Sequence, residues 1–157
     1  MLALCLLLAA CSRAAPPPDT PGARLEAAAV SRGLVPDASG GSLVGSWASE
    51  TDRLCVVPNG DKLRVGVLID YGEGQGCAAT GEATRKDDRL RFDFGACRFD
   101  AHYDGERISF PAELPSACNA ACTGRASLTA LAVARLSDSA SEATTLRAPN
   151  GRALCGN

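Results

Sequence analysis

The sequence has few of the residues on which catalysis and nucleic-acid binding commonly depend. Its 157 residues include one histidine, one tryptophan and two tyrosines. Because His102 is the only imidazole, a Ser-His-Asp relay has one possible base, and His102 falls on the polar side of a predicted strand. The 16 basic and 18 acidic residues give a net charge of −2. Nucleic-acid binders carry a basic excess, so we set that class of partner aside.

The usual catalytic and cofactor motifs are also missing. The chain contains no G-x-S-x-G elbow, no C-x-x-C redox pair and no G-x-G-x-x-G turn. Cys118 and Cys122 are spaced as zinc ligands can be, but no second ligand pair accompanies them. We therefore expect a protein that is not an enzyme, with no cofactor and no metal.

One acidic, glycine-rich segment stands out, DYGEGQG at 70–76. Its carboxylates, Asp70 and Glu73, are two of the six to eight oxygen ligands that a calcium ion takes. The composition is more typical of an exposed loop between strands, and such loops often carry binding sites.

The chain begins with an uncharged apolar run, MLALCLLLAA, at residues 1–10. This length suits the apolar core of a signal peptide and is too short to span a bilayer. The run ends in Leu8-Ala9-Ala10-Cys11, which resembles the lipobox of bacterial lipoproteins. The resemblance implies cleavage before Cys11 and acylation of its thiol and new amine with fatty-acyl chains such as palmitate. No Lys or Arg precedes the run, and we expect translation to start a few residues upstream.

The lipobox resemblance also implies a location, the bacterial cell envelope with the protein facing the periplasm. Ser12 after the lipidated cysteine favours the outer membrane over the inner one. Residues 11–41 are rich in Pro, Gly and Ala and predict a flexible tether. Within it, Thr20-Pro21 is a plausible start for a short helix that stops at Gly33.

Residues 42–157 predict an all-β domain. Apolar residues alternate with charged ones over several short segments, which indicates strands with one buried face. Turn sequences separate them, including Asn59-Gly60 and Asp104-Gly105. Short antiparallel strands in succession favour a meander closed into a small barrel or a sandwich. The clearest alternating segments are 62–70, 89–94, 98–103 and 107–110.

The end of this domain is less clearly patterned. Residues 124–136 predict one long strand. The tail from 140 to 157 fits either a short helix capped by Ser139 or a hairpin around Asn150-Gly151.

The eight cysteines support an oxidising compartment. Removal of Cys5 with the signal peptide and lipidation of Cys11 leave six, an even number suited to complete pairing. From the strand positions we expect three disulfides that staple the domain. The expected pairs are Cys77–Cys97, Cys118–Cys122 and Cys55–Cys155.

Gly45-Ser46-Trp47 resembles the G-x-W that opens the first strand of lipocalins and avidin-like barrels. The resemblance implies that Trp47 closes the floor of a barrel. It also implies an alternative function, a calycin-like barrel that binds a small apolar ligand. A further alternative is a domain resembling the lysozyme inhibitors of bacterial envelopes, which are small disulfide-bearing barrels with a lipid anchor.

Our first expectation is a lipid-anchored, non-enzymatic domain that contacts the membrane through its anchor and binds a component of the envelope. The identity of that partner and the oligomeric state are open from the sequence.

Overall fold

The computed structural model describes residues 20–32 and 41–156, which belong to two separate units divided between Val35 and Pro36. The expected signal peptide and Cys11 lie outside the described residues. Helix α1 (Pro21–Ser31) lies in the segment where the sequence favours one, and the Ala23 amide donates to Thr20 Oγ1 at its start. No helix among the described residues has the length and apolar character needed to cross a membrane.

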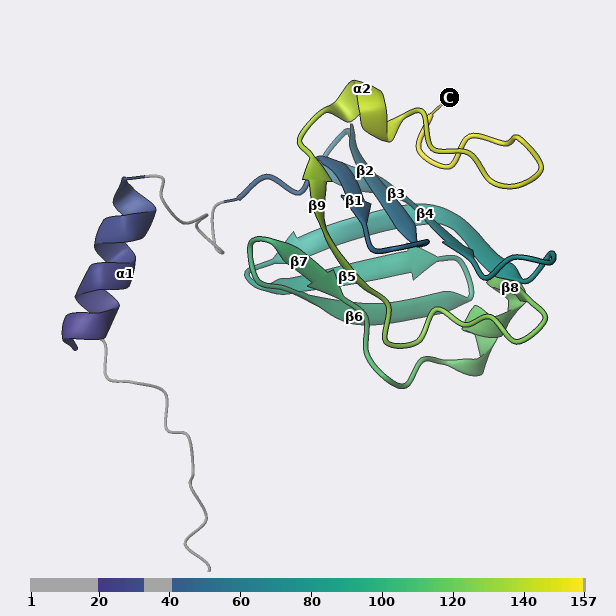
Figure 1. Cartoon of the computed structure of the whole chain (residues 1–157), viewed down its shortest axis with the longest axis horizontal. Coiled ribbons are helices and arrows are strands. Elements are labelled where there is room, and N and C mark those ends of the chain that lie inside the picture. Colours follow the sequence, from purple (N-terminus) through teal and green to yellow (C-terminus); the bar gives the residue numbers. More distant parts are fainter. Residues whose placement is uncertain (1–19, 33–40, 157) are drawn as a thin grey trace, which may run out of the picture. The chain divides into compact units, whose positions relative to one another are not determined.

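The second unit is a closed antiparallel barrel, which confirms the predicted all-β meander and selects the barrel over the sandwich (Figure 1). Around the barrel the order is β1-β2-β3-β4-β5-β6-β7-β9, and β9 pairs with β1 to close it. The short β8 adds to one end of β4. The strands are β1 (Gly45–Ala48), β2 (Arg53–Asn59), β3 (Lys62–Asp70), β4 (Gly76–Lys86), β5 (Arg89–Phe94), β6 (Cys97–Tyr103), β7 (Arg107–Ser109), β8 (Cys122–Thr123) and β9 (Ala132–Ser137).

Side chains fill the inside of the barrel. The alternation along β3 places Val65, Val67 and Ile69 inward, where all three are buried, while Gly66 and Leu68 between them face the outside of the barrel and contact the C-terminal segment. Four phenylalanines pack together in the core with ring centroids between 4.7 and 6.1 Å apart. They are Phe92, Phe94, Phe99 and Phe110.

The two ends of the barrel differ. Because the strands alternate in direction, the chain enters at the same end as the β2–β3, β4–β5 and β6–β7 turns, and we call this the floor end. The opposite end, the loop end, holds the 71–75 loop, the 95–96 turn and the long 110–131 connection. This connection contains the 3₁₀ helix η1 (Ser116–Ala121) and returns to β9.

The disulfides confirm one expected pair and correct two. Cys55 is bonded to Cys155, as expected. Cys77 is bonded to Cys122, its cross-strand neighbour on β8, and not to Cys97. Cys97 is bonded to Cys118 instead. The expected Cys77–Cys97 pair fails because β5 lies between β4 and β6 in the sheet. The Cys118–Cys122 pair fails because η1 directs Cys118 to β6 while Cys122 joins β4.

The C-terminal segment, residues 139–156, crosses the outside of β2 and β3 (Figure 1). It contains both structures that the sequence left open. Helix α2 (Ala140–Ala143) is capped by Ser139, whose Oγ accepts the Glu142 amide, and an Arg147–Ala153 bridge follows. Its buried residues pack with Cys55 and Val57 of β2 in a second small core outside the barrel. They are Ala143, Ala148, Leu154 and Cys155.

The predicted strand at 124–136 is mostly wrong. Only residues from Ala132 onward pair, in β9, and the preceding residues form a loop that closes the barrel at the loop end. Within that loop Ala130 has a φ of +55°, which a strand does not allow, while Leu128 and Leu131 are buried in the barrel core.

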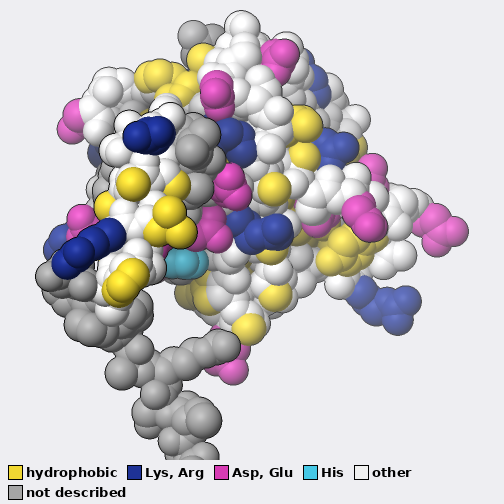
Figure 2. All heavy atoms as spheres, turned by 60° about the vertical axis from the view of Figure 1, so that its left-hand side comes forward, with side chains coloured by type: hydrophobic (Ala, Val, Ile, Leu, Met, Phe, Trp, Pro, Cys, Tyr) yellow, Lys and Arg dark blue, Asp and Glu magenta, His cyan; other side chains and the backbone are white. Residues whose placement is uncertain are grey.

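The outer surface carries interspersed charges, as Figure 2 shows for the face that it displays. On β5 and β6, Arg91 pairs with Asp100, and Arg98 pairs with Asp93. The hydrogen bond from Arg98 lowers the pKa of the Asp93 carboxyl. His102 lies on the same outer face and is exposed, with Asp88 3.5 Å from its Nδ1. This placement is that of a solvated surface histidine.

Candidate functional site

Trp47 lies on β1 near the floor end, where the chain enters the barrel. Its side chain is fully buried, and its indole N–H donates to the Leu43 carbonyl at 3.0 Å. The Tyr103 ring meets it edge-on, with 5.8 Å between ring centroids. Gly45 permits this entry of the chain because its φ is +134° and a Cβ there would overlap the Ser137 carbonyl.

Two arginines close the floor, and no sequence pattern marked either of them. The Arg135 guanidinium lies 4.1 Å from the Trp47 ring centroid and donates to Tyr103 Oη and to the Ser42 carbonyl. Arg85 lies over the Tyr103 ring and donates to the Gly41 carbonyl. The floor is therefore closed by two guanidinium groups stacked on aromatic rings. The same two arginines bind the carbonyls of Gly41 and Ser42, where the chain enters the barrel.

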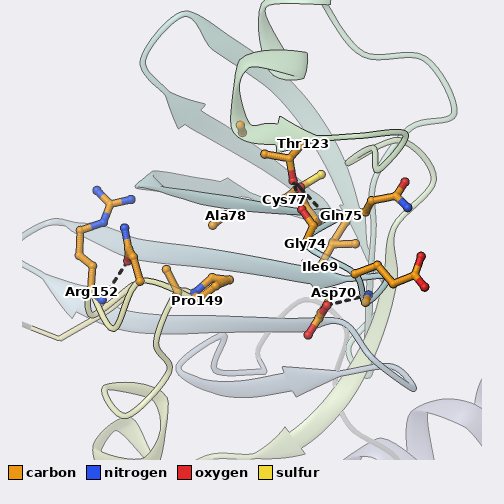
Figure 3. A pocket seen from close by; sticks show the side chains of 15 residues that line it. Ile69, Asp70, Gly74, Gln75, Cys77, Ala78, Thr123, Pro149 and Arg152 are labelled. Carbon is orange, nitrogen blue, oxygen red and sulfur yellow. Dashed lines mark hydrogen bonds between the residues drawn. The ribbon is translucent and has the colours of Figure 1, made fainter.

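A groove of about 530 Å³ opens on the outside of the barrel at the loop end (Figure 3). It lies between the 71–75 loop, β8 and the C-terminal hairpin at 148–152. Its volume falls within the range of small-ligand pockets, roughly 300–1,000 Å³. The residues that line it include Ile69, Asp70, Ala78, Thr123, Pro149 and Arg152.

The 71–75 loop is held in place by hydrogen bonds. Within it, the Tyr71 amide donates to the Gln75 carbonyl at 2.9 Å, and the Gln75 amide donates to the Gly72 carbonyl. Across the groove wall, Thr123 Oγ1 donates to the Gly74 carbonyl at 2.8 Å, and the Arg125 amide donates to Gln75 Oε1. The neighbouring Cys77–Cys122 disulfide ties the two segments together covalently.

Asp70 and Glu73, weighed above as calcium ligands, do line this groove. In the described part of the chain no group of three or more His, Cys, Asp or Glu side chains is placed to hold a metal ion. Asp70 Oδ1 accepts the Gly72 amide at 2.8 Å and thereby shapes the loop. Tyr71 beside it is 59% exposed.

Comparison of the chain with protein-family models, with curated proteins and with solved structures finds no match.

Proposed function

We propose that this protein is a lipid-anchored component of the bacterial envelope that binds a partner through the groove at the loop end and catalyses no reaction. One observation carries the proposal. The interior of the barrel is filled by side chains, while the 530 Å³ groove lies outside it, at the end opposite to where the chain enters. A binding function then belongs to the outer loop surface.

The anchor in this proposal is the acylated Cys11, with residues 12–41 as its tether. Two or more acyl chains give stable membrane attachment, whereas one chain gives marginal attachment. Because Arg85 and Arg135 hold Gly41 and Ser42 at the floor, the tether leaves from the floor end. The groove therefore lies at the end of the barrel opposite to Gly41 and Ser42.

A calycin-like carrier of a small apolar ligand is the second candidate. The closed barrel and the buried Trp47 at its floor favour it. The phenylalanine cluster stands against it, because these rings occupy the space that an interior ligand would take. The lysozyme-inhibitor alternative is supported by the architecture alone, a small barrel with disulfides.

The anchor is tested by replacing Cys11 with serine. We expect the protein to move from the membrane fraction to the soluble periplasmic fraction, since serine offers no thiol for the acyl group. Cys5→Ser is the matched control and should leave the membrane fraction unchanged. Fractionation and immunoblotting provide the measurement. A Cys11→Ser protein that still sediments with membranes would contradict the anchor.

The groove is tested by Pro149→Trp, which places an indole where an exposed groove residue now lies. We expect crosslinked capture of envelope proteins to fall at least tenfold by quantitative mass spectrometry. The control is Pro58→Trp, an exposed proline on β2 at the floor end. Equal thermal unfolding of both variants would show that the fold is intact. If both capture the same proteins as the wild type, the groove is not the binding surface.

A further inference from the structure

The groove carries opposite charges at its two sides. Asp70 and Glu73 come from the loop after β3, and Arg152 comes from the C-terminal hairpin. In Figure 3, Arg152 and Asp70 lie on opposite sides, with Pro149 and Ala78 between them. A ligand that spans the groove therefore meets an anionic side and a cationic side.

Two of these charges are available to a ligand. Within residues 20–32 and 41–156, neither the Glu73 carboxylate nor the Arg152 guanidinium takes part in an ion pair or side-chain hydrogen bond. Both residues are exposed. By contrast, the acidic and basic residues on the outer faces of β5 and β6 are largely paired with each other.

The middle of the groove is apolar and built from small side chains. Ala78, Ala121, Ala148 and Pro149 are among its lining residues. Small side chains let an extended main chain approach the strands closely. No aromatic ring is among the lining residues, so the groove offers no flat apolar face for a sugar to stack on. Charges at both sides also make it a poor site for an acyl chain.

The glycine-rich wall is preorganised. Gly72, Glu73 and Gly74 all have left-handed φ values, of +76°, +51° and +73°, and hydrogen bonds to Thr123 and within the loop hold this geometry. Glutamate is an unusual residue at such a position, because a side chain with a Cβ disfavours left-handed φ. The loop thereby presents a carboxylate on a fixed backbone, which reduces the entropy lost on binding.

We infer that the groove binds an extended segment of a protein partner that places a cationic side chain beside Glu73 and Asp70, small apolar side chains over Ala78, and an anionic group beside Arg152. The inference rests on the proposed function, in which the loop end is the binding surface. It adds the class of ligand, and the charge pattern that the ligand must carry.

The test is selection of random 12-residue peptides displayed on phage, using the full-length chain as bait. We expect enriched peptides that carry a basic and an acidic residue at a recurrent spacing with small apolar residues between. On Arg152→Glu the acidic preference should be lost and replaced by a basic one. The control is Arg147→Glu, on the same C-terminal segment but not among the residues that line the groove, and it should keep the wild-type preference.

Synthetic copies of the enriched peptides then give affinities by fluorescence anisotropy. We expect about tenfold weaker binding to Arg152→Glu and to Glu73→Lys, because each change turns an attraction into a repulsion. A peptide designed with the opposite charge should recover the loss. An unchanged charge preference on Arg152→Glu, or no enrichment, overturns the inference.

A second probe, hexameric N-acetylglucosamine, separates this inference from the proposed function. Direct binding of this sugar that Pro149→Trp weakens, with no enrichment of peptides, would overturn the peptide assignment. Loss of capture by Pro149→Trp would still support the proposed function in that case. Peptide binding that persists in Pro149→Trp would contradict the groove itself.

Discussion

A variant in which Cys55 and Cys155 are both replaced by alanine is expected to lose about 4 kcal/mol of its free energy of unfolding. The bond links residues separated by 100 positions and so encloses nearly the whole barrel. In the chain-entropy model, a crosslink over a loop of that length stabilises the fold by about 4.7 kcal/mol. The two other disulfides lie inside this loop and shorten it, so we expect a value below that limit.

The effect should be concentrated in the C-terminal segment. This segment packs on the barrel through few buried side chains, mainly Ala143, Ala148 and Leu154. Leu154 lies so close to the outside of β3 that a Cβ at Gly66 would come within 2.6 Å of its Cβ. Without the bond, the segment should detach at low denaturant before the barrel unfolds, and the groove should lose the wall that carries Arg152.

Urea unfolding followed by circular dichroism, together with amide hydrogen exchange, measures both parts of this prediction. The control is the Cys97→Ala/Cys118→Ala variant, whose bond closes a loop over 21 positions. This control should lower the free energy of unfolding by about 3 kcal/mol and leave the amides of the C-terminal segment protected from hydrogen exchange. A loss below 1 kcal/mol in the Cys55/Cys155 variant would mean that packing alone holds the segment.

The strands and most turns were predictable because they depend on local patterns. The alternation in 62–70 fixes which side chains face inward, and the structure places β3 at Lys62–Asp70. The Asp104-Gly105 turn likewise follows from its residues, and the Asp104 carboxylate accepts the amides of Glu106 and Arg107. The C-terminal helix also follows from a local signal, the Ser139 cap.

The choice of a barrel over a sandwich and two of the three cysteine pairs were not predictable, since they depend on which strands become neighbours. The pairing of Cys77 with Cys122 requires that β8 fold back onto the first residues of β4, a contact across 45 positions. The segment before β9 misled the prediction for a related reason. Leu128 and Leu131 are apolar because they close the loop end, and the periodicity of a strand does not account for them.

Some residues of the candidate site could be identified from local sequence patterns, and others could not. Trp47 was found from a three-residue motif, and the 70–76 segment from its glycine and acidic content. Arg135 and Arg152 were not found, because nothing near them in the sequence marks them. Their roles depend on the register of β9 with β1 and on the crossing of the C-terminal segment over the barrel.

Replacing Trp47 with alanine is expected to lower the free energy of unfolding by about 3–5 kcal/mol, the range for truncation of a large buried aromatic side chain. Two further groups lose a partner. Arg135 loses the ring on which it stacks at 4.1 Å, and the buried Tyr103 loses its edge-to-face contact. Because Arg135 also binds the Ser42 carbonyl, the residues through which the chain enters should become less protected from hydrogen exchange.

Tyr71→Ala is the matched control, an aromatic truncation at an exposed position, and it should change stability by no more than about 0.5 kcal/mol. Arg135→Met separates the cation from the ring. Arg135→Met should lower the free energy of unfolding by less than Trp47→Ala does. It should also shift the fluorescence emission of Trp47, the only tryptophan in the sequence. A Trp47→Ala variant as stable as the wild type would mean that the phenylalanine cluster alone sustains the barrel. The loop end would then fold independently of the floor, and Pro149→Trp and Arg152→Glu would retain their expected effects in that background.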